Sequence, residues 1–142
     1  MNLVAILESN TRKSPDKDCL RANGQGYSYR TIRKEAEKAA GLLQQMGLSK
    51  GDRIAIMSQN TVGFVIAFYG SLMAGGVVVP INHKLMAPEV DYILGHSEAR
   101  IFLFDGSLAG VAGKLSASVR KLALDSAAQG FERFEDLLTP AP

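Results

Sequence analysis

The fold of this chain is decided by one uncharged stretch of twelve residues, Ser71-Leu72-Met73-Ala74-Gly75-Gly76-Val77-Val78-Val79-Pro80-Ile81-Asn82. Its glycine pair ends a helix, because glycine takes a positive φ that other residues resist. The valines that follow favour an extended backbone, and Pro80 closes the strand. The stretch therefore predicts a helix end, a glycine turn and a buried strand in direct succession, as in a βαβ unit.

Further strands and helices alternate on either side of this stretch. Apolar runs predict strands at 53–57, 77–79, 100–104 and 121–124. Apolar spacing and capping residues predict helices at 62–74, 87–96 and, more weakly, 108–119. Because the strands are apolar throughout, we expect a doubly wound α/β fold, with a mainly parallel sheet and helices on both faces. Ligands of such sheets bind at the carboxyl ends of the strands, here after Met57, Val79 and Phe104.

The first fifty residues have a different pattern. Asn2 can cap a helix that ends near Ser14, and Ser28 can cap a second helix from Tyr29 to Met46. Between them, Gly24-Gln25-Gly26 predicts the turn of a short hairpin. We therefore expect residues 1–142 to form one unit. Its parts are a helix, hairpin and helix at 1–50, a βαβ core at 51–125, and a carboxyl-terminal linker at 126–142, in which residues 131–138 form one or two amphipathic turns.

Composition excludes several classes of function. Sixteen basic residues are interleaved with 14 acidic ones, which gives a net charge of +2 and no strong field for nucleic acid. A single cysteine, Cys19, cannot form an internal disulfide or a cysteine-based metal site. The amino terminus lacks the pattern of a signal peptide, and glycine and proline interrupt the uncharged run before it reaches the length of a membrane span. We therefore expect a cytoplasmic protein without a transmembrane segment.

Several segments, in order, resemble the amino-terminal subdomain of the AMP-forming acyl-CoA synthetases, the fatty-acid–CoA ligases of the adenylate-forming superfamily. They are the opening stretch together with Tyr27-Ser28-Tyr29-Arg30-Thr31-Ile32, Gly51-Asp52-Arg53-Ile54-Ala55-Ile56, Glu89-Val90-Asp91-Tyr92-Ile93-Leu94, Ala99-Arg100-Ile101-Phe102-Leu103 and Phe134-Glu135-Asp136-Leu137-Leu138. The resemblance implies a parent enzyme that uses ATP, Mg²⁺ and coenzyme A to activate a fatty acid or another carboxylic acid through an acyl-adenylate.

The resemblance also implies which parts of that enzyme this chain lacks. The family's phosphate loop, ribose-binding acid and catalytic lysine come later in its sequence, so we expect no catalytic residue, no metal site and no cofactor bound by this fragment, which is predicted to be inactive alone. One position carries over: some members place an arginine after the Pro-x-Asn turn, near the coenzyme A phosphates, and Lys84 stands there. Lys84 is a candidate coenzyme A ligand, with a solvated surface lysine as the alternative.

Other interpretations stay open at this stage. The chain could be a stand-alone module that binds a nucleotide or an acyl group, an adenylation-domain fragment of another adenylate-forming enzyme, or a protein that self-associates through exposed core surface. Gly106, Gly110, Gly113 and Lys114 do not fit the spacing of a phosphate loop. His83 and His96 lack nearby ligand partners, so a metal site is not indicated.

Overall fold

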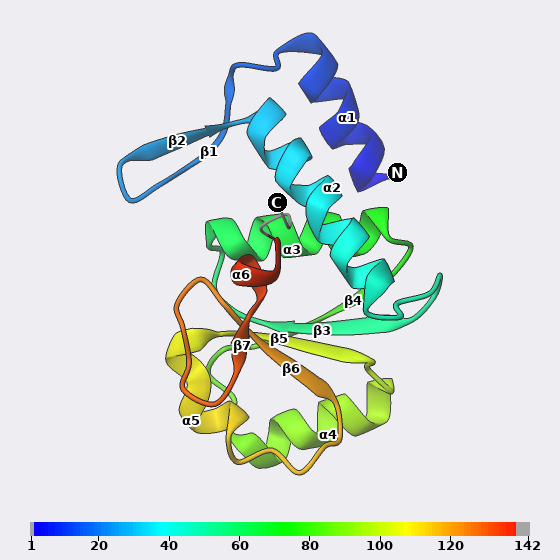
Figure 1. Cartoon of the computed structure of the whole chain (residues 1–142), viewed down its shortest axis with the longest axis vertical. Helices are drawn as coiled ribbons and strands as arrows, with labels where there is room; N and C mark the ends of the chain where they lie inside the picture. Colours follow the sequence, from blue (N-terminus) through cyan, green and yellow to red (C-terminus); the bar gives the residue numbers. More distant parts are fainter. Residues whose placement is uncertain (1, 139–142) are drawn as a thin grey trace.

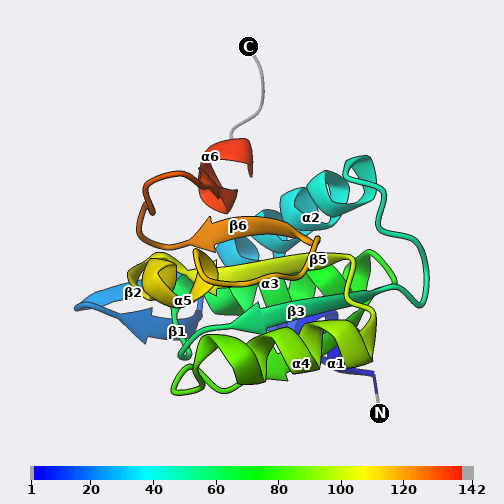
Figure 2. The same ribbon diagram turned by 90° about the horizontal axis from the view of Figure 1, so that it is seen from below.

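A five-stranded parallel sheet forms the centre of the computed structural model, which describes residues 2–138. Its strands are β3 (Arg53–Met57), β4 (Val77–Ile81), β5 (Ile101–Asp105), β6 (Arg120–Leu124) and β7 (Glu132–Arg133). They lie in the order β4-β3-β5-β6-β7, and every neighbouring pair is parallel. Figure 2 shows the arrows of β3 and β6 pointing the same way. The predicted parallel α/β sheet is confirmed.

Helices cover both faces of this sheet (Figure 1). One face carries α2 (Tyr29–Gln45), α3 (Val62–Met73) and α6 (Phe134–Leu138). The other carries α4 (Ala87–Ser97) and α5 (Ala109–Ala112), which follows the 3-10 turn η1 (Gly106–Leu108). The expectation of helices on both faces is therefore confirmed.

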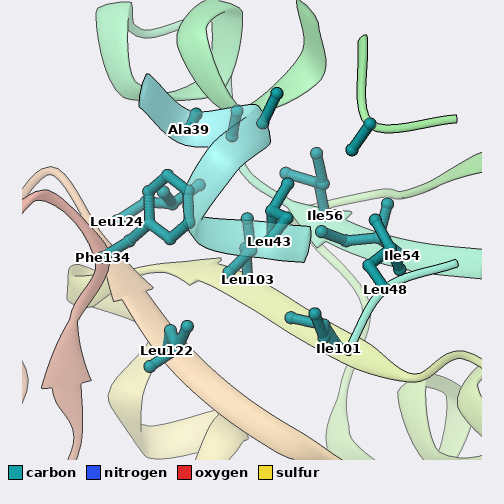
Figure 3. Packing of buried hydrophobic residues seen from close by; sticks show 13 residues of the cluster. Ala39, Leu43, Leu48, Ile54, Ile56, Ile101, Leu103, Leu122, Leu124 and Phe134 are labelled. Atoms are coloured by element: carbon teal, nitrogen blue, oxygen red, sulfur yellow. The ribbon is translucent and has the colours of Figure 1, made fainter. Parts of the chain in front are cut away.

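Strand β3 shows how the sequence fills both layers. Ile54 and Ile56 pack with α2 and α3, whereas Ala55 and Met57 pack with α4. All of them are at most 1% exposed. Figure 3 shows the first layer, where Ile54 and Ile56 lie with Leu43 of α2. Apolar residues in succession are required here because side chains alternate between two covered faces.

Before the sheet, α1 (Leu3–Lys13) is followed by an antiparallel hairpin of β1 (Asp18–Ala22) and β2 (Gln25–Ser28), which extends away from the sheet in Figure 1. The predicted caps are confirmed, because the side chains of Asn2 and Ser28 accept backbone N–H groups of α1 and α2. The predicted short hairpin is confirmed, but its turn lies one residue earlier than the predicted residues 24–26. Asn23 and Gly24 form it, with φ of 52° and 77°, since Asn-Gly suits a two-residue turn.

The opening stretch folds as expected at its glycines and differs at Pro80. Gly75 has a φ of +85° after α3. Pro80 lies inside β4, which is an edge strand, rather than at its end. The Val77 N–H points toward the β3 side, where it donates to Asp52 O at 2.8 Å. Because backbone N–H groups alternate in direction along a strand, the nitrogen of residue 80 points to the open edge, where proline's missing N–H costs no hydrogen bond. The edge position also explains why Val77 is 49% exposed instead of buried.

The predicted helix at 108–119 was wrong beyond residue 112. Its glycines weaken a helix, and the Asp91 carboxylate of α4 holds the following loop by accepting the N–H groups of Ser116 and Ala117 at 2.9–3.0 Å. These contacts, the Ser116 N–H first, lower the pKa of the Asp91 carboxyl. Asp91 therefore replaces helical hydrogen bonds as the support of this segment.

The amphipathic turn expected within residues 131–138 is present as α6, whereas the strand β7 just before it was not expected. β7 pairs with β6, and Phe134 is 1% exposed within the α2 layer. A two-residue strand gives no periodic pattern, which is why the sequence did not indicate it. Residues 139–142 of the expected linker lie outside the described residues.

The contact of α2 with α3 depends on a missing side chain at Gly70. A Cβ there would lie 2.5 Å from Ala39 Cβ and 3.1 Å from Ala36 O. We therefore expect Gly70→Ala to force the helices apart and to lower the free energy of unfolding by about 1–3 kcal/mol. Urea denaturation followed by circular dichroism measures this.

Gly41 supplies the matched control, because it lies in the same helix pair and a Cβ there meets nothing within 4 Å. Gly41→Ala should stabilise the protein by about 0.5–1 kcal/mol through helix propensity alone. Equal stability of the Gly70→Ala variant and the wild type would contradict the close-packing explanation.

Candidate functional site

The carboxyl ends of β3, β4 and β5 lie level with one another. Met57 pairs in register with both Ile81 and Phe104. The chain leaves β3 for β4 through α3 on one face and leaves β4 for β5 through α4 on the other. The connection from β3 runs outward to β4, whereas the connection from β5 runs the other way to β6, so the strand order reverses between β3 and β5, and parallel sheets bind their ligands at such a point.

Two loops meet at this edge. Gln59, in the loop 58–61 after β3, lies with its Nε2 atom 3.1 Å from Nε2 of His83, in the loop after β4. Next to it, the Asn82 side chain accepts the Lys84 N–H at 2.9 Å and shapes the turn. The side chains of residues 58–60 and 82–84 include no carboxylate. These two loops are therefore rich in hydrogen-bond donors and carry one full positive charge, while Asp105 at the end of β5 and Asp125 after β6 bring carboxylates to the same edge of the sheet.

The structure places the predicted site residue Lys84 at this edge, exposed to solvent. Its coenzyme A role stays a prediction. Sequence reasoning missed the pairing of Gln59 with His83, which are 24 residues apart. Only the sheet order, with β4 beside β3, could have indicated that these two loops are neighbours.

A second polar cluster fixes the start of α3. The Asp125 carboxylate, just after β6, accepts the Thr61 hydroxyl at 2.5 Å and the Gly63 N–H at 3.0 Å. Thr61 also caps α3 by accepting the Phe64 N–H at 3.0 Å. In turn, the Asp125 N–H donates to Glu135 Oε2 of α6 at 2.7 Å. The end of the described chain is thereby tied to the loop after β3.

Glu135 is held in an unfavourable setting for a charge. Its side chain is 22% exposed, and its Oε1 atom is buried without a hydrogen-bond partner. Arg133 Nε lies 3.9 Å from that atom and donates instead to Asp125 O at 2.8 Å. Burial raises the pKa of the Glu135 carboxyl, and the Asp125 carboxylate adds to the rise.

A hollow of about 220 Å³ lies near the same edge, where the start of α4 meets the residues after β5. Its lining consists of Met86, Ala87, Ser107, Leu108, Gly110, Val111 and Lys114. Gly106, beside it, is a packing glycine, since a Cβ there would collide with Ser126 O. A larger hollow, about 520 Å³, lies between the start of α1 and Leu72 and Met73 at the opposite end of α3, away from this edge.

Residues 2–138 contain neither a cluster of metal ligands nor a membrane-spanning helix. No group of three or more His, Cys, Asp or Glu side chains in that range is arranged to hold a metal ion. Within the same range, no helix combines the length and the apolar character that crossing a bilayer requires.

Comparison with known proteins decides the family. Residues 7–139 match the family described as AMP-binding enzyme. The chain belongs to this family. The resemblance drawn from the sequence is thus confirmed: the chain matches the amino-terminal portion of the AMP-binding, adenylate-forming superfamily, with fatty-acid–CoA ligases among its relatives.

Named relatives include ligases and peptide synthetases. The chain is 37% identical over 90 residues to the long-chain-fatty-acid–CoA ligase FadD13 of Mycobacterium tuberculosis. The matched residues make up 63% of this chain and 18% of that protein. It is 36% identical to a long-chain-fatty-acid–CoA ligase of Bacillus subtilis, over 71% of this chain and 18% of the relative. It is 30% identical to surfactin synthase subunit 3 of Bacillus subtilis, over 89% of this chain and 10% of that protein.

The fold is shared with solved structures. A benzoate CoA ligase from Burkholderia xenovorans superimposes with a TM-score of 0.89 and 26% identity, covering 99% of this chain and 29% of that one. The chain thus spans less than a third of these relatives' length, 18% in the case of FadD13.

Replacing Glu135 by glutamine tests the unfavourable charge. A raised carboxyl pKa means that the folded state is most stable with Glu135 protonated, below the ordinary value of 4.5, and loses that stability as the pH rises through the folded value. Glutamine keeps an acceptor for the Asp125 N–H without a charge. We therefore expect Glu135→Gln to gain stability relative to the wild type as the pH rises, measured by urea unfolding from acid to neutral pH.

Glu132→Gln is the matched control, because Glu132 forms an exposed ion pair with Arg120. The Glu132→Gln variant should show no gain in the free energy of unfolding at neutral pH. If the free energy of unfolding of the Glu135→Gln variant differs from that of the wild type by the same amount at every pH, the buried charge is fully compensated.

Proposed function

We propose that this chain acts as the amino-terminal part of an ATP-dependent, AMP-forming ligase that joins a fatty acid or a related carboxylic acid to coenzyme A. The supporting observation is the family match over residues 7–139 together with relatives named as long-chain-fatty-acid–CoA ligases. In such a reaction the acid attacks ATP to give an acyl-adenylate and pyrophosphate, and the coenzyme A thiol then displaces AMP.

The residues of this chain supply only part of that chemistry. Activation of the acid needs a phosphate cradle, a Mg²⁺ ligand and a cation facing the developing charge. The glycines between 106 and 113 do not supply the cradle, because their spacing is wrong and Gly106 packs against Ser126. We therefore propose that residues 1–142 by themselves do not turn over substrate.

A pyrophosphate-release assay tests this proposal. The chain is mixed with ATP, Mg²⁺, coenzyme A and a panel of fatty acids, aromatic acids and amino acids, with a complete fatty-acid–CoA ligase as the positive control. We expect no pyrophosphate above background with any acid. Steady release with one of them would overturn the inactivity and would also identify the acid.

The second candidate is the adenylation part of a peptide synthetase. The similarity to surfactin synthase subunit 3 favours it, because it extends over 89% of this chain. In that case the acid would be an amino acid, and the thiol acceptor would not be coenzyme A. A stand-alone module that binds a nucleotide without converting it remains a further prediction, and calorimetry with ATP and AMP tests it.

Within the leading proposal, Lys84 contacts a phosphate of coenzyme A. The support is its exposed position on a donor-rich edge whose loops, 58–60 and 82–84, carry no carboxylate. An ammonium group can meet phosphate as a point charge, although without the paired hydrogen bonds of arginine.

Calorimetry with coenzyme A tests Lys84. Lys84→Ala should weaken binding about tenfold, the loss expected for one charge-assisted contact. Lys50→Ala is the matched control, because Lys50 is an exposed lysine that precedes β3 at the opposite end of the sheet. Unchanged affinity of the Lys84→Ala variant, or an equal loss in both variants, would remove Lys84 from the site.

A further inference from the structure

His83 stands at the point where the loops after β3 and β4 meet, and neither the family match nor the relatives' names assign it a role. Its ring is half-buried, whereas Gln59 and Lys84 on either side are exposed. The imidazole of His83 and the ammonium group of Lys84 are two different hydrogen-bond donors on one short turn.

The contact with Gln59 fixes the ring chemically. The Gln59 amide nitrogen lies 3.1 Å from His83 Nε2, and an amide nitrogen can only donate. With the Gln59 amide in this orientation, Nε2 is the acceptor and the ring proton is carried by Nδ1. The ring then offers an N–H donor at Nδ1. The Asn82 side chain accepts the Lys84 N–H at 2.9 Å, and this hydrogen bond fixes the turn that bears the ring.

The surrounding charges select the ligand. The loops 58–60 and 82–84 contain amide, hydroxyl, imidazole and ammonium groups and no carboxylate. The carboxylates near these loops are already engaged as acceptors: Glu89 accepts the Met86 N–H at 3.0 Å, Asp105 at the end of β5 accepts the Ser107 N–H at 2.9 Å, and Asp125 accepts the Gly63 N–H at 3.0 Å. A site of this composition favours an anion with several acceptor oxygens, such as a phosphate ester.

We propose that His83 is a second ligand-contacting residue of this edge, which donates its Nδ1–H to a phosphate group of the anion that Lys84 meets, and that Gln59 positions the ring. This inference rests on the proposed coenzyme A site, and it adds a neutral donor and a positioning residue to the single charge of Lys84. The phosphate source to which it commits is coenzyme A.

Variants of His83 distinguish a hydrogen-bond donor at Nδ1 from a side chain that only fills space. His83→Ala should weaken coenzyme A binding about tenfold in calorimetry with the full chain. His83→Asn carries an amide near the position of Nδ1 and should recover most of the affinity, whereas His83→Gln places its amide near Nε2 and should not. His96→Ala is the matched control: His96 stacks on Tyr92 of α4, with ring centroids 5.6 Å apart, and it should bind like the wild type.

A spectroscopic readout tests the positioning role of Gln59. Nitrogen-15 spectra of the imidazole rings should show His83 with its proton on Nδ1 in the free protein. Gln59→Ala should give a mixture of the two tautomers and a several-fold weaker affinity, whereas Asn60→Ala in the same exposed loop should change neither. Addition of coenzyme A should shift the Nδ1 resonance of the wild type.

The outcomes distinguish this inference from the proposed function. If coenzyme A does not bind, or if Lys84→Ala binds it as well as the wild type does, the proposed site fails and this inference fails with it. If Lys84→Ala weakens binding but His83→Ala does not, only the role of His83 is overturned. Equal binding of ATP, inorganic phosphate and coenzyme A would overturn the commitment to coenzyme A as the source of the phosphate.

Discussion

The burial of β3 on both faces is the constraint on which the rest of the structure depends. Each of its four residues from Ile54 to Met57 is closed off from water by one helix layer or the other. Full burial of such side chains contributes about 1.5–3 kcal/mol each for the larger ones. A shift of one residue would send every one of them to the wrong layer, so the register of β3 is fixed. The level ends of β3, β4 and β5 follow from this register, and the meeting of two loops at one edge follows from the level ends.

The two ends of the described chain also depend on this central strand. On the α2 side, Gly70 lets α3 approach α2 closely, which brings the helical amino-terminal part onto the sheet. At the carboxyl edge, Asp125 accepts the Gly63 N–H at the start of α3 and donates its own N–H to Glu135, which attaches β6 and α6 to the loop after β3. A Cβ on Gly63 would lie 2.5 Å from Asp125 Oδ1 and 2.7 Å from Glu135 Oε2. Two carboxyl groups therefore converge on one glycine, and the stability gained by closing the fold there is offset in part by a poorly solvated charge.

Local chemistry explains which parts of the fold could be predicted from the sequence. Asn2 and Ser28 cap helices through contacts with residues two or three positions away, so their role is visible in a short window. The place of Pro80 inside a strand is not local, since it depends on β4 having a neighbour on one side only. The end of the helix after residue 112 depends on Asp91, which lies 25 residues before its partner Ser116 in the chain. In both of these failures, a partner distant in sequence outweighed the local preference.

The same distinction applies to the candidate site. Lys84 could be singled out from the sequence because a resemblance to a family pointed to one position after one turn. The pairing of Gln59 with His83 has no signal in either loop alone, because a lone glutamine and a lone histidine are ordinary surface residues. It arises only when the sheet order places β4 beside β3 and sets both strand ends level. The meeting of the donor-rich loops 58–60 and 82–84 at one edge is therefore a property of the fold, and what they bind is better sought from the sheet topology than from any single motif.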